Sequence, residues 1–202
     1  MKKTLIILVL FFSFQNAFPQ LYSSIKKTSK GIDLYGYTDG KGNIKIEHKY
    51  PLIFTDTLNT IAFVINRNYE LIAIDSTGQK LFNVYKFDNG PDYISEGLFR
   101  ITKKNKVGYA DIQGNIIIEP VYFAASPFKN NIAKVTKQGV KKKDWEYTII
   151  KNAKWGIINK QGELIVPFFY DEIIFLNNGN IELINGENKI QIHIISLTKN
   201  SQ

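Results

Sequence analysis

The sequence predicts an all-β protein of tandem three-stranded antiparallel β-meanders, about 36 residues each, stacked in an open array. Two observations predict this fold. A glycine recurs at Gly36, Gly108 and Gly156, each time with an aromatic or aliphatic residue before it and Asp or Asn three residues after it. A second glycine follows six residues later, and a degenerate segment adds one more. These turn glycines are Gly42, Gly78, Gly114 and Gly162, spaced 36, 36 and 48 residues apart, and they define copies one to four.

The third copy shows the strands of one unit. Alternating β-forming residues over 97–101 predict its first strand, and residues 106–111 and 116–122 predict the second and third. The turn between the last two is predicted where Asp or Asn stands three residues before the turn glycine. Its side chain can accept backbone N–H groups of the turn, and the glycine can take a positive φ. The residues at this position are Asp39, Asp75, Asp111 and Asn159.

The glycine inside each second strand is predicted to be structural. Glycine weakens a strand unless something requires the missing side chain, such as a neighbouring aromatic ring or a close backbone approach. Trp155, beside Gly156, is assigned to the same structural role. Pro120 and Pro167 remove ladder donors near the ends of two third strands, and they predict an edge or a bulge there.

The two ends of the array are incomplete. Copy one has a weak first strand around 23–27, and residues 180–185 and 189–195 supply a first and a second strand after copy four, with no third. We expect these ends to cap an open stack. The alternative is that they complete one shared blade and close a small β-propeller.

Two stretches resemble the bacterial WG-repeat family, also called KWG repeats: KVGYADIQGNIIIEPVY from Lys106 and KWGIINKQGELIVPFFYD from Lys154. The resemblance covers about residues 33–195 and is poorest in copy two, where Leu71 and Ile72 replace the Trp-Gly pair. It implies an all-β, multi-copy, non-catalytic protein with no defined general ligand. It transfers no catalytic residue, because the family motif has none that is established as such.

The amino terminus predicts export. Residues 1–20 have the pattern of a secretory signal peptide, with Lys2 and Lys3 before the apolar run 5–12. We expect a periplasmic or extracellular monomer whose repeat domain spans residues 21–202, with no stable membrane span after cleavage. The chain contains no cysteine, which excludes disulfides and a lipoprotein anchor.

The net charge of +8 comes mainly from lysine, since Arg67 and Arg100 are the only arginines. Proteins that bind nucleic acids usually rely on arginine forks, so we expect no nucleic-acid partner. The lysines either form a solvated surface or attract anionic polymers of the cell envelope.

The sequence offers little for catalysis. His48 and His193 are the only histidines, and neither has neighbours at metal-ligand spacing. The motifs of zinc proteases, serine hydrolases and phosphate-binding loops are absent. We therefore expect no enzyme activity, no metal and no cofactor.

The candidate binding site is the extra segment of about 12 residues between copies three and four, within 138–153. Inserted loops of repeat proteins often lie on the working face. A tryptophan beside a lysine run can stack on a sugar or an aromatic ligand while the lysines attract an anionic polymer. The candidate partner-binding residues are Lys141, Lys142, Lys143, Trp145 and Tyr147. The alternative is a longer hairpin whose Trp145 covers the neighbouring sheet edge.

We expect an exported binding or scaffolding module for a protein or a cell-envelope glycan. The alternative is an envelope hydrolase, or an inhibitor of one, with an unrecognised site. Aromatic side chains gathered on one face would favour binding, and the candidates are Trp145, Tyr147, Tyr93 and Phe99. A closed polar cleft would favour catalysis, and its candidates are Glu96, Asp144 and Glu146.

Overall fold

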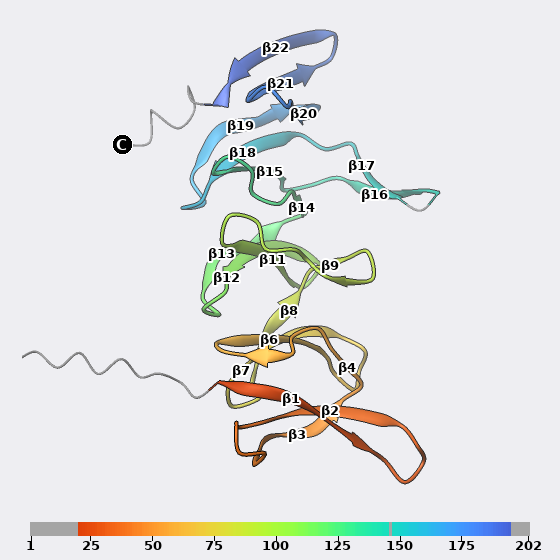
Figure 1. Ribbon diagram of the computed structural model, residues 1–202. Coiled ribbons are helices and arrows are strands. Elements are labelled where there is room, and N and C mark those ends of the chain that lie inside the picture. The colour runs from red at the N-terminus through yellow and green to blue at the C-terminus, as the bar shows by residue number, and fades with distance from the viewer. Residues whose placement is uncertain (1–19, 146, 195–202) are drawn as a thin grey trace, which may run out of the picture.

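The computed structural model describes residues 20–145 and 147–194, so the expected signal peptide lies outside the described residues except for Gln20. Small antiparallel sheets are stacked one above another, from the amino-terminal strands to the carboxy-terminal ones (Figure 1). The described residues form no closed barrel or propeller. The predicted open array of β-meanders is therefore confirmed, and the propeller alternative is wrong. No helix in the described ranges is long and apolar enough to cross a membrane.

Each layer repeats the same succession of strands. The first strands are β1 (Leu21–Lys27), β6 (Ile61–Ile65), β11 (Leu98–Lys103), β15 (Ile132–Thr136) and β21 (Asn180–Asn185). The second strands are β2 (Asp33–Thr38), β7 (Leu71–Asp75), β12 (Lys106–Asp111), β18 (Trp155–Asn159) and β22 (Asn188–His193). The third strands are β3 (Ile44–Tyr50), β8 (Lys80–Val84), β13 (Ile116–Tyr122) and β19 (Leu164–Tyr170).

Shorter strands complete the fold. They are β4 (Leu52–Ile53), β5 (Thr57–Leu58), β9 (Lys86–Phe87), β10 (Gly90–Pro91), β14 (Ala124–Ala125) and β20 (Glu172–Phe175). An additional hairpin is formed by β16 (Val140–Asp144) and β17 (Tyr147–Lys151). β1 is a full strand where the sequence predicts a weak one, and β22 ends at His193, two residues before the predicted end.

The chain joins each layer to the next by main-chain pairing. After the third strand, β4 pairs with β6, β14 pairs with β15, and β20 pairs with β21. In copy two, β8 itself pairs with β11, so copies two and three share a seven-stranded sheet. These links hold successive layers together in addition to side-chain packing.

A close backbone approach explains the glycine inside each second strand. The register between β12 and β13 shifts around Gly108, so β13 bulges over this residue. A Cβ at Gly108 would overlap the carbonyl oxygen of Ile118 and lie 2.6 Å from the nitrogen of Pro120. The backbones of β3 and β19 approach Gly36 and Gly156 in the same way.

Copy two lacks both the glycine and this bulge. Ile72 takes the place of the glycine, and it pairs with Asn83 in a register that continues unshifted to Ala73 and Phe82. β8 accordingly has five residues, whereas the other third strands have seven. The bulge and the glycine therefore form one structural unit.

The hairpin turns share one hydrogen-bonding pattern. In copy three, Oδ1 of Asp111 accepts the backbone N–H groups of Gln113 and Asn115 at 3.0 and 2.8 Å. Asn159 accepts two N–H groups through Oδ1 in the equivalent turn of copy four. The turn glycines all have positive φ: Gly42, Gly78, Gly114 and Gly162.

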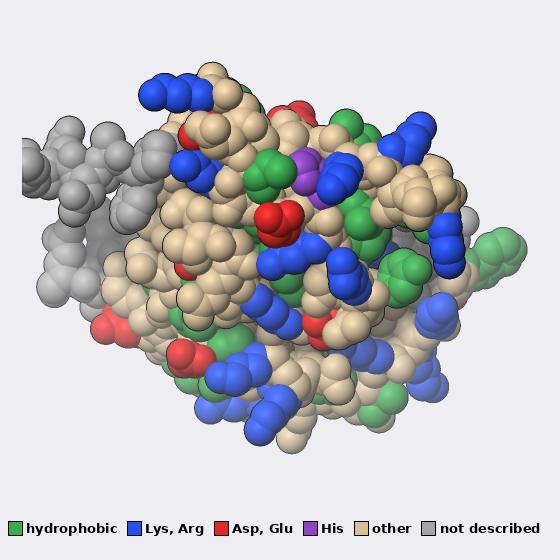
Figure 2. All heavy atoms as spheres, turned by 90° about the horizontal axis from the view of Figure 1, so that it is seen from below, with side chains coloured by type: hydrophobic (Ala, Val, Ile, Leu, Met, Phe, Trp, Pro, Cys, Tyr) green, Lys and Arg blue, Asp and Glu red, His purple; other side chains and the backbone are tan. Residues whose placement is uncertain are grey.

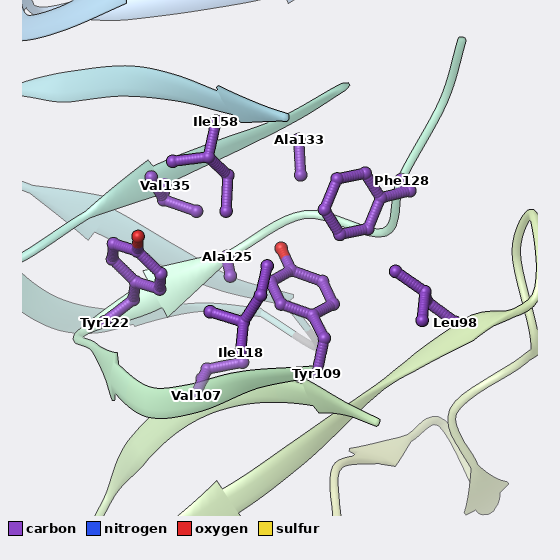
Figure 3. Packing of buried hydrophobic residues seen from close by; sticks show 10 residues of the cluster. All are labelled: Leu98, Val107, Tyr109, Ile118, Tyr122, Ala125, Phe128, Ala133, Val135 and Ile158. Atoms are coloured by element: carbon purple, nitrogen blue, oxygen red, sulfur yellow. The ribbon is translucent and has the colours of Figure 1, made fainter. Parts of the chain in front are cut away.

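Apolar clusters fill the spaces between successive layers. Between copies three and four, Tyr109 and Ile118 extend from one sheet toward Val135 and Ile158 of the next (Figure 3). The phenol of Tyr109 donates a hydrogen bond of 2.6 Å to the carbonyl oxygen of Ser126. Burial raises the pKa of this phenol well above its ordinary value.

Candidate binding site at the inserted hairpin

The extra residues of copy four form the hairpin of β16 and β17. Five residue pairs connect the two strands, from Val140 and Lys151 at the base to Asp144 and Tyr147 near the tip. The hairpin forms a two-stranded sheet of its own and extends sideways from the stack (Figure 1). It prolongs the connection between β15 and β18, where the other copies have a shorter one.

The tip of the hairpin is open to solvent. Trp145 has a φ of 55° and is 95% exposed, so the alternative in which it covers the neighbouring sheet edge is wrong. Lys141, Lys142 and Lys143 are exposed along β16. Because side chains alternate along a strand, Lys141 and Lys143 share one face. Tyr147 lies in β17, and its side chain is outside the described part of the structure.

Of the aromatic residues whose gathering on one face would favour binding, Phe99 does not take part. It is 1% exposed and belongs to the core between copies two and three. Tyr93 is exposed, and its ring packs against Phe87 with the centroids 5.5 Å apart.

The acidic residues whose closed cleft would favour catalysis have other surroundings in the described part of the chain. The carboxylate of Glu96 accepts the backbone N–H groups of Asn130 and Asn131 at 2.6 and 2.9 Å and pairs with Lys160 at 3.4 Å. These contacts connect copies three and four. Asp144 lies exposed near the hairpin tip, and Glu146 is outside the described residues. Within the described ranges, no three His, Asp or Glu side chains come together as metal ligands would.

The charged surface is dominated by lysine. The end of the stack formed by copy one shows many lysine side chains and fewer acidic ones (Figure 2).

His48 is partly buried in β3, where its Nε2 lies 3.0 Å from Oγ of Ser24. The contact joins β1 and β3 across β2 and gives His48 a packing role.

A pocket of about 270 Å³ lies against the inserted hairpin. Lys141 and Ile150 line it from the hairpin, and residues of copies two, three and four complete it. Its charged and aromatic lining is Lys134, Lys141, Tyr85, Phe123 and Trp155. We call it the Lys134 pocket. Sequence reasoning missed it, because residues so far apart in the sequence share no motif.

The ammonium group of Lys134 is partly buried. Its Nζ donates a hydrogen bond of 3.0 Å to the carbonyl oxygen of Ile173 and lies 5.3 Å from the ring centroid of Trp155. It forms no ion pair with any described residue. Burial lowers the pKa of Lys134, and the negative charge of Glu172 opposes part of that effect.

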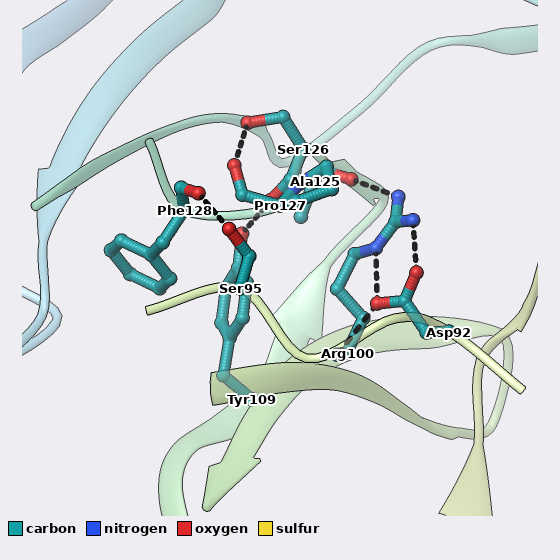
Figure 4. Close-up of polar contacts among 8 residues, drawn as sticks. All are labelled: Asp92, Ser95, Arg100, Tyr109, Ala125, Ser126, Pro127 and Phe128. Carbon is teal, nitrogen blue, oxygen red and sulfur yellow. Dashed lines mark hydrogen bonds and ion pairs between the residues drawn. The ribbon is translucent and has the colours of Figure 1, made fainter. Parts of the chain in front are cut away.

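Copy three has a buried cation at the equivalent position. Arg100 is 5% exposed, and its guanidinium donates to both carboxylate oxygens of Asp92, at 2.8 and 2.5 Å (Figure 4). It also donates to the carbonyl oxygen of Ala125 at 3.0 Å and lies over the ring of Tyr85. Burial opposes the charge of Arg100, but Asp92 outweighs it and the net pKa is raised.

Comparison with known protein families finds a match in the second half of the chain. Residues 108–140 and 155–182 match the family of WG-containing repeats. The residues between these two segments, 141–154, include most of the inserted hairpin. The hairpin is therefore an addition to the repeat pattern. The chain matches no curated protein.

Proposed function

Since residues 108–140 and 155–182 match the family of WG-containing repeats, we propose that the chain is an exported, non-enzymatic binding module whose inserted hairpin contacts an anionic glycan of the cell envelope. The stacked sheets act as the scaffold, and the hairpin supplies the contact surface. Export is supported by the amino-terminal pattern of Lys2 and Lys3 before an apolar run.

The observation that carries this proposal is the exposure of Trp145 on a hairpin that the repeat does not need. A large aromatic side chain in water adds nothing to the packing of the stack, whereas it can stack on a sugar ring. The three exposed lysines of β16 add positive charge beside it and favour a polyanion.

The test is retention of the mature chain on peptidoglycan and on an immobilised acidic polysaccharide. We expect Trp145→Ala to abolish retention and to leave the melting temperature unchanged, because the side chain has no packing contact to lose. Retention of the unmodified chain should also weaken with added salt, since exposed charges are screened.

Tyr69 offers a matched control. It is 84% exposed and has a φ of 60°, so it resembles Trp145 in exposure and backbone but lies outside the inserted hairpin. Tyr69→Ala should therefore retain binding. If Trp145→Ala is retained as well as the unmodified chain is, the hairpin is not the contact surface.

A further inference from the structure

We propose that the Lys134 pocket binds the carboxylate of a uronic acid residue, with Lys134 as its cationic partner. The inference rests on the proposed function for the polymeric nature of the ligand and adds its chemical class. The hairpin would hold the polymer, and the pocket would recognise one acidic sugar of it.

Lys134 and Arg100 occupy the same place in their copies. In the strand register, Arg100 lies opposite Tyr109, and Lys134 lies opposite Ile157. Tyr109 and Ile157 each directly follow the glycine inside the second strand. Each cation also donates to the carbonyl oxygen of the residue three positions after the tyrosine that ends the third strand, Tyr122 in β13 and Tyr170 in β19. These acceptors are Ala125 for Arg100 and Ile173 for Lys134.

The anion beside the cation is present in copy three and missing in copy four. In copy three, Oδ2 of Asp92 accepts the backbone N–H of Arg100 at 2.9 Å while the same carboxylate binds the guanidinium. In copy four, Oγ of Ser126 accepts the backbone N–H of Lys134 at 3.1 Å, eight residues away as in copy three. A serine hydroxyl fulfils the backbone role but brings no negative charge. Copy two also has a hydroxyl here, since Oγ1 of Thr55 accepts the backbone N–H of Phe63 at 3.0 Å, but Phe63 carries no charge. Of these three copies, copy four is the one that has a cation without an anion beside it.

The position of Ser126 opens into the Lys134 pocket. Ser126, Lys134 and Lys141 all line it, so a ligand carboxylate entering there would meet two ammonium groups. Lys106 adds positive charge nearby, with its Nζ 5.9 Å from the ring centroid of Phe123. Glu172 is the acidic group that acts on Lys134, and it does not form an ion pair with it. A partly buried cation gains most from an anion that replaces its lost hydration.

The other walls and the volume of the Lys134 pocket indicate what carries the carboxylate. The walls include Phe123 and Trp155, whose rings suit the flat apolar face of a sugar ring, and Tyr85, whose ring is covered by Arg100 on one face. A volume of about 270 Å³ lies at the lower end of ligand pockets and suits a single ring. A carboxylate attached to such a ring is a uronic acid. Acidic peptide side chains carry the carboxylate without the ring.

The experiment titrates the mature chain with sodium glucuronate and follows chemical shifts by NMR. We expect saturable binding of glucuronate. We expect glucose, which lacks the carboxylate, to bind at least about tenfold more weakly. An acetylated glutamate amide should also bind about tenfold more weakly, because it lacks the ring. Equal binding of that amide would overturn the assignment to a sugar.

Two variants test the role of Lys134. Lys134→Met keeps the aliphatic chain and removes the charge, so glucuronate binding should fall about tenfold or more. Ser126→Asp places the carboxylate of copy three into copy four; it should raise the melting temperature and abolish glucuronate binding. If both variants fold and bind glucuronate as the unmodified chain does, the inference is overturned.

The outcome is separable from that of the proposed function. Loss of glucuronate binding in Lys134→Met supports the pocket even if Trp145→Ala keeps full polymer retention, a result that would overturn only the role of the hairpin. Conversely, suppose that Trp145→Ala abolishes polymer retention but Lys134→Met binds glucuronate as the unmodified chain does. That result would overturn only the assignment of the Lys134 pocket.

Discussion

Copies three and four place a cation at the same point of the fold and treat its charge differently. Arg100 is enclosed and bound through two hydrogen bonds by Asp92, whereas Lys134 faces a pocket and has Ser126 in the corresponding position. A buried charge is stable only when it is paired, and the planar guanidinium suits a carboxylate better than an ammonium does. The comparison teaches that the same two positions of the repeat can hold a closed ion pair or leave a cation open to a pocket.

The largest effect should come from breaking the pair in copy three. Asp92→Asn leaves the buried Arg100 without a countercharge, and we expect a loss of about 3–5 kcal/mol in the free energy of unfolding. Chemical denaturation measures this loss. In the double variant with Arg100→Met, much of it should be recovered, because no unpaired charge remains. A loss below about 1 kcal/mol in the single variant would show that the pair does not differ energetically from a surface one.

A smaller difference is expected at the in-strand glycines of the same two copies. The atoms nearest to a Cβ at Gly108 all belong to the backbone of β13, whereas Gly156 also faces the side chains of Leu164 and Phe168, at 3.1 and 3.2 Å. Side chains can move aside more easily than a strand can. We expect Gly108→Ala to cost about 1–3 kcal/mol of unfolding free energy and Gly156→Ala to cost less.

The two alanine variants can be compared by thermal or chemical denaturation. Equal losses at both positions would mean that the carbonyl oxygen opposite each glycine, in Ile118 and Val166, decides the cost alone. A cost near zero at Gly108 would contradict the close backbone approach as the reason for the glycine.

The repeat unit was predictable because its signals are local. The second and third strands of copy three match their predicted bounds, 106–111 and 116–122, since turn residues and alternation fix them within a few positions. The extra residues also predicted a structural departure at 138–153. The exposure of Trp145 was not predictable, because a hairpin tip has no sequence signal for what lies beside it.

The Lys134 pocket could not be predicted for a different reason. Lys134 has apolar neighbours in β15, and this pattern is typical of a solvent-facing lysine in any half-buried strand. The signal that could have revealed it is the alignment of first strands, which places Arg100 and Lys134 at one position. Only the structure shows that Asp92 is buried with Arg100 and bound to it. Only the structure shows that Ser126 takes the corresponding position beside Lys134.

The smallest effect concerns the turns, where copy three has Asp111 and copy four has Asn159. Partial burial works against the Asp111 carboxylate, but hydrogen bonds from Asn115 and Gln113 outweigh it and lower its pKa. A carboxyl group whose pKa is lower in the folded state stabilises the fold above its unfolded pKa of about 3.9 and loses that contribution as the pH falls through the folded pKa. An amide does not titrate.

Asp111→Asn should therefore lower stability near neutral pH slightly, where the charged carboxylate contributes, and reduce the loss of stability between neutral pH and acid. Unfolding free energies measured at pH 7 and at about pH 3 test this, since the unfolded carboxyl is largely protonated at the lower value. In copy four, Nδ2 of Asn159 donates to the carboxylate of Glu163 at 2.7 Å, so Asn159→Asp would place two carboxylates together and should lower stability at pH 7 more than at pH 3. Asp111 and Asn159 each accept the same two backbone N–H groups of their turns. If neither variant alters the pH dependence of stability, these backbone contacts alone decide the stability of both turns, and the carboxylate charge of Asp111 contributes nothing.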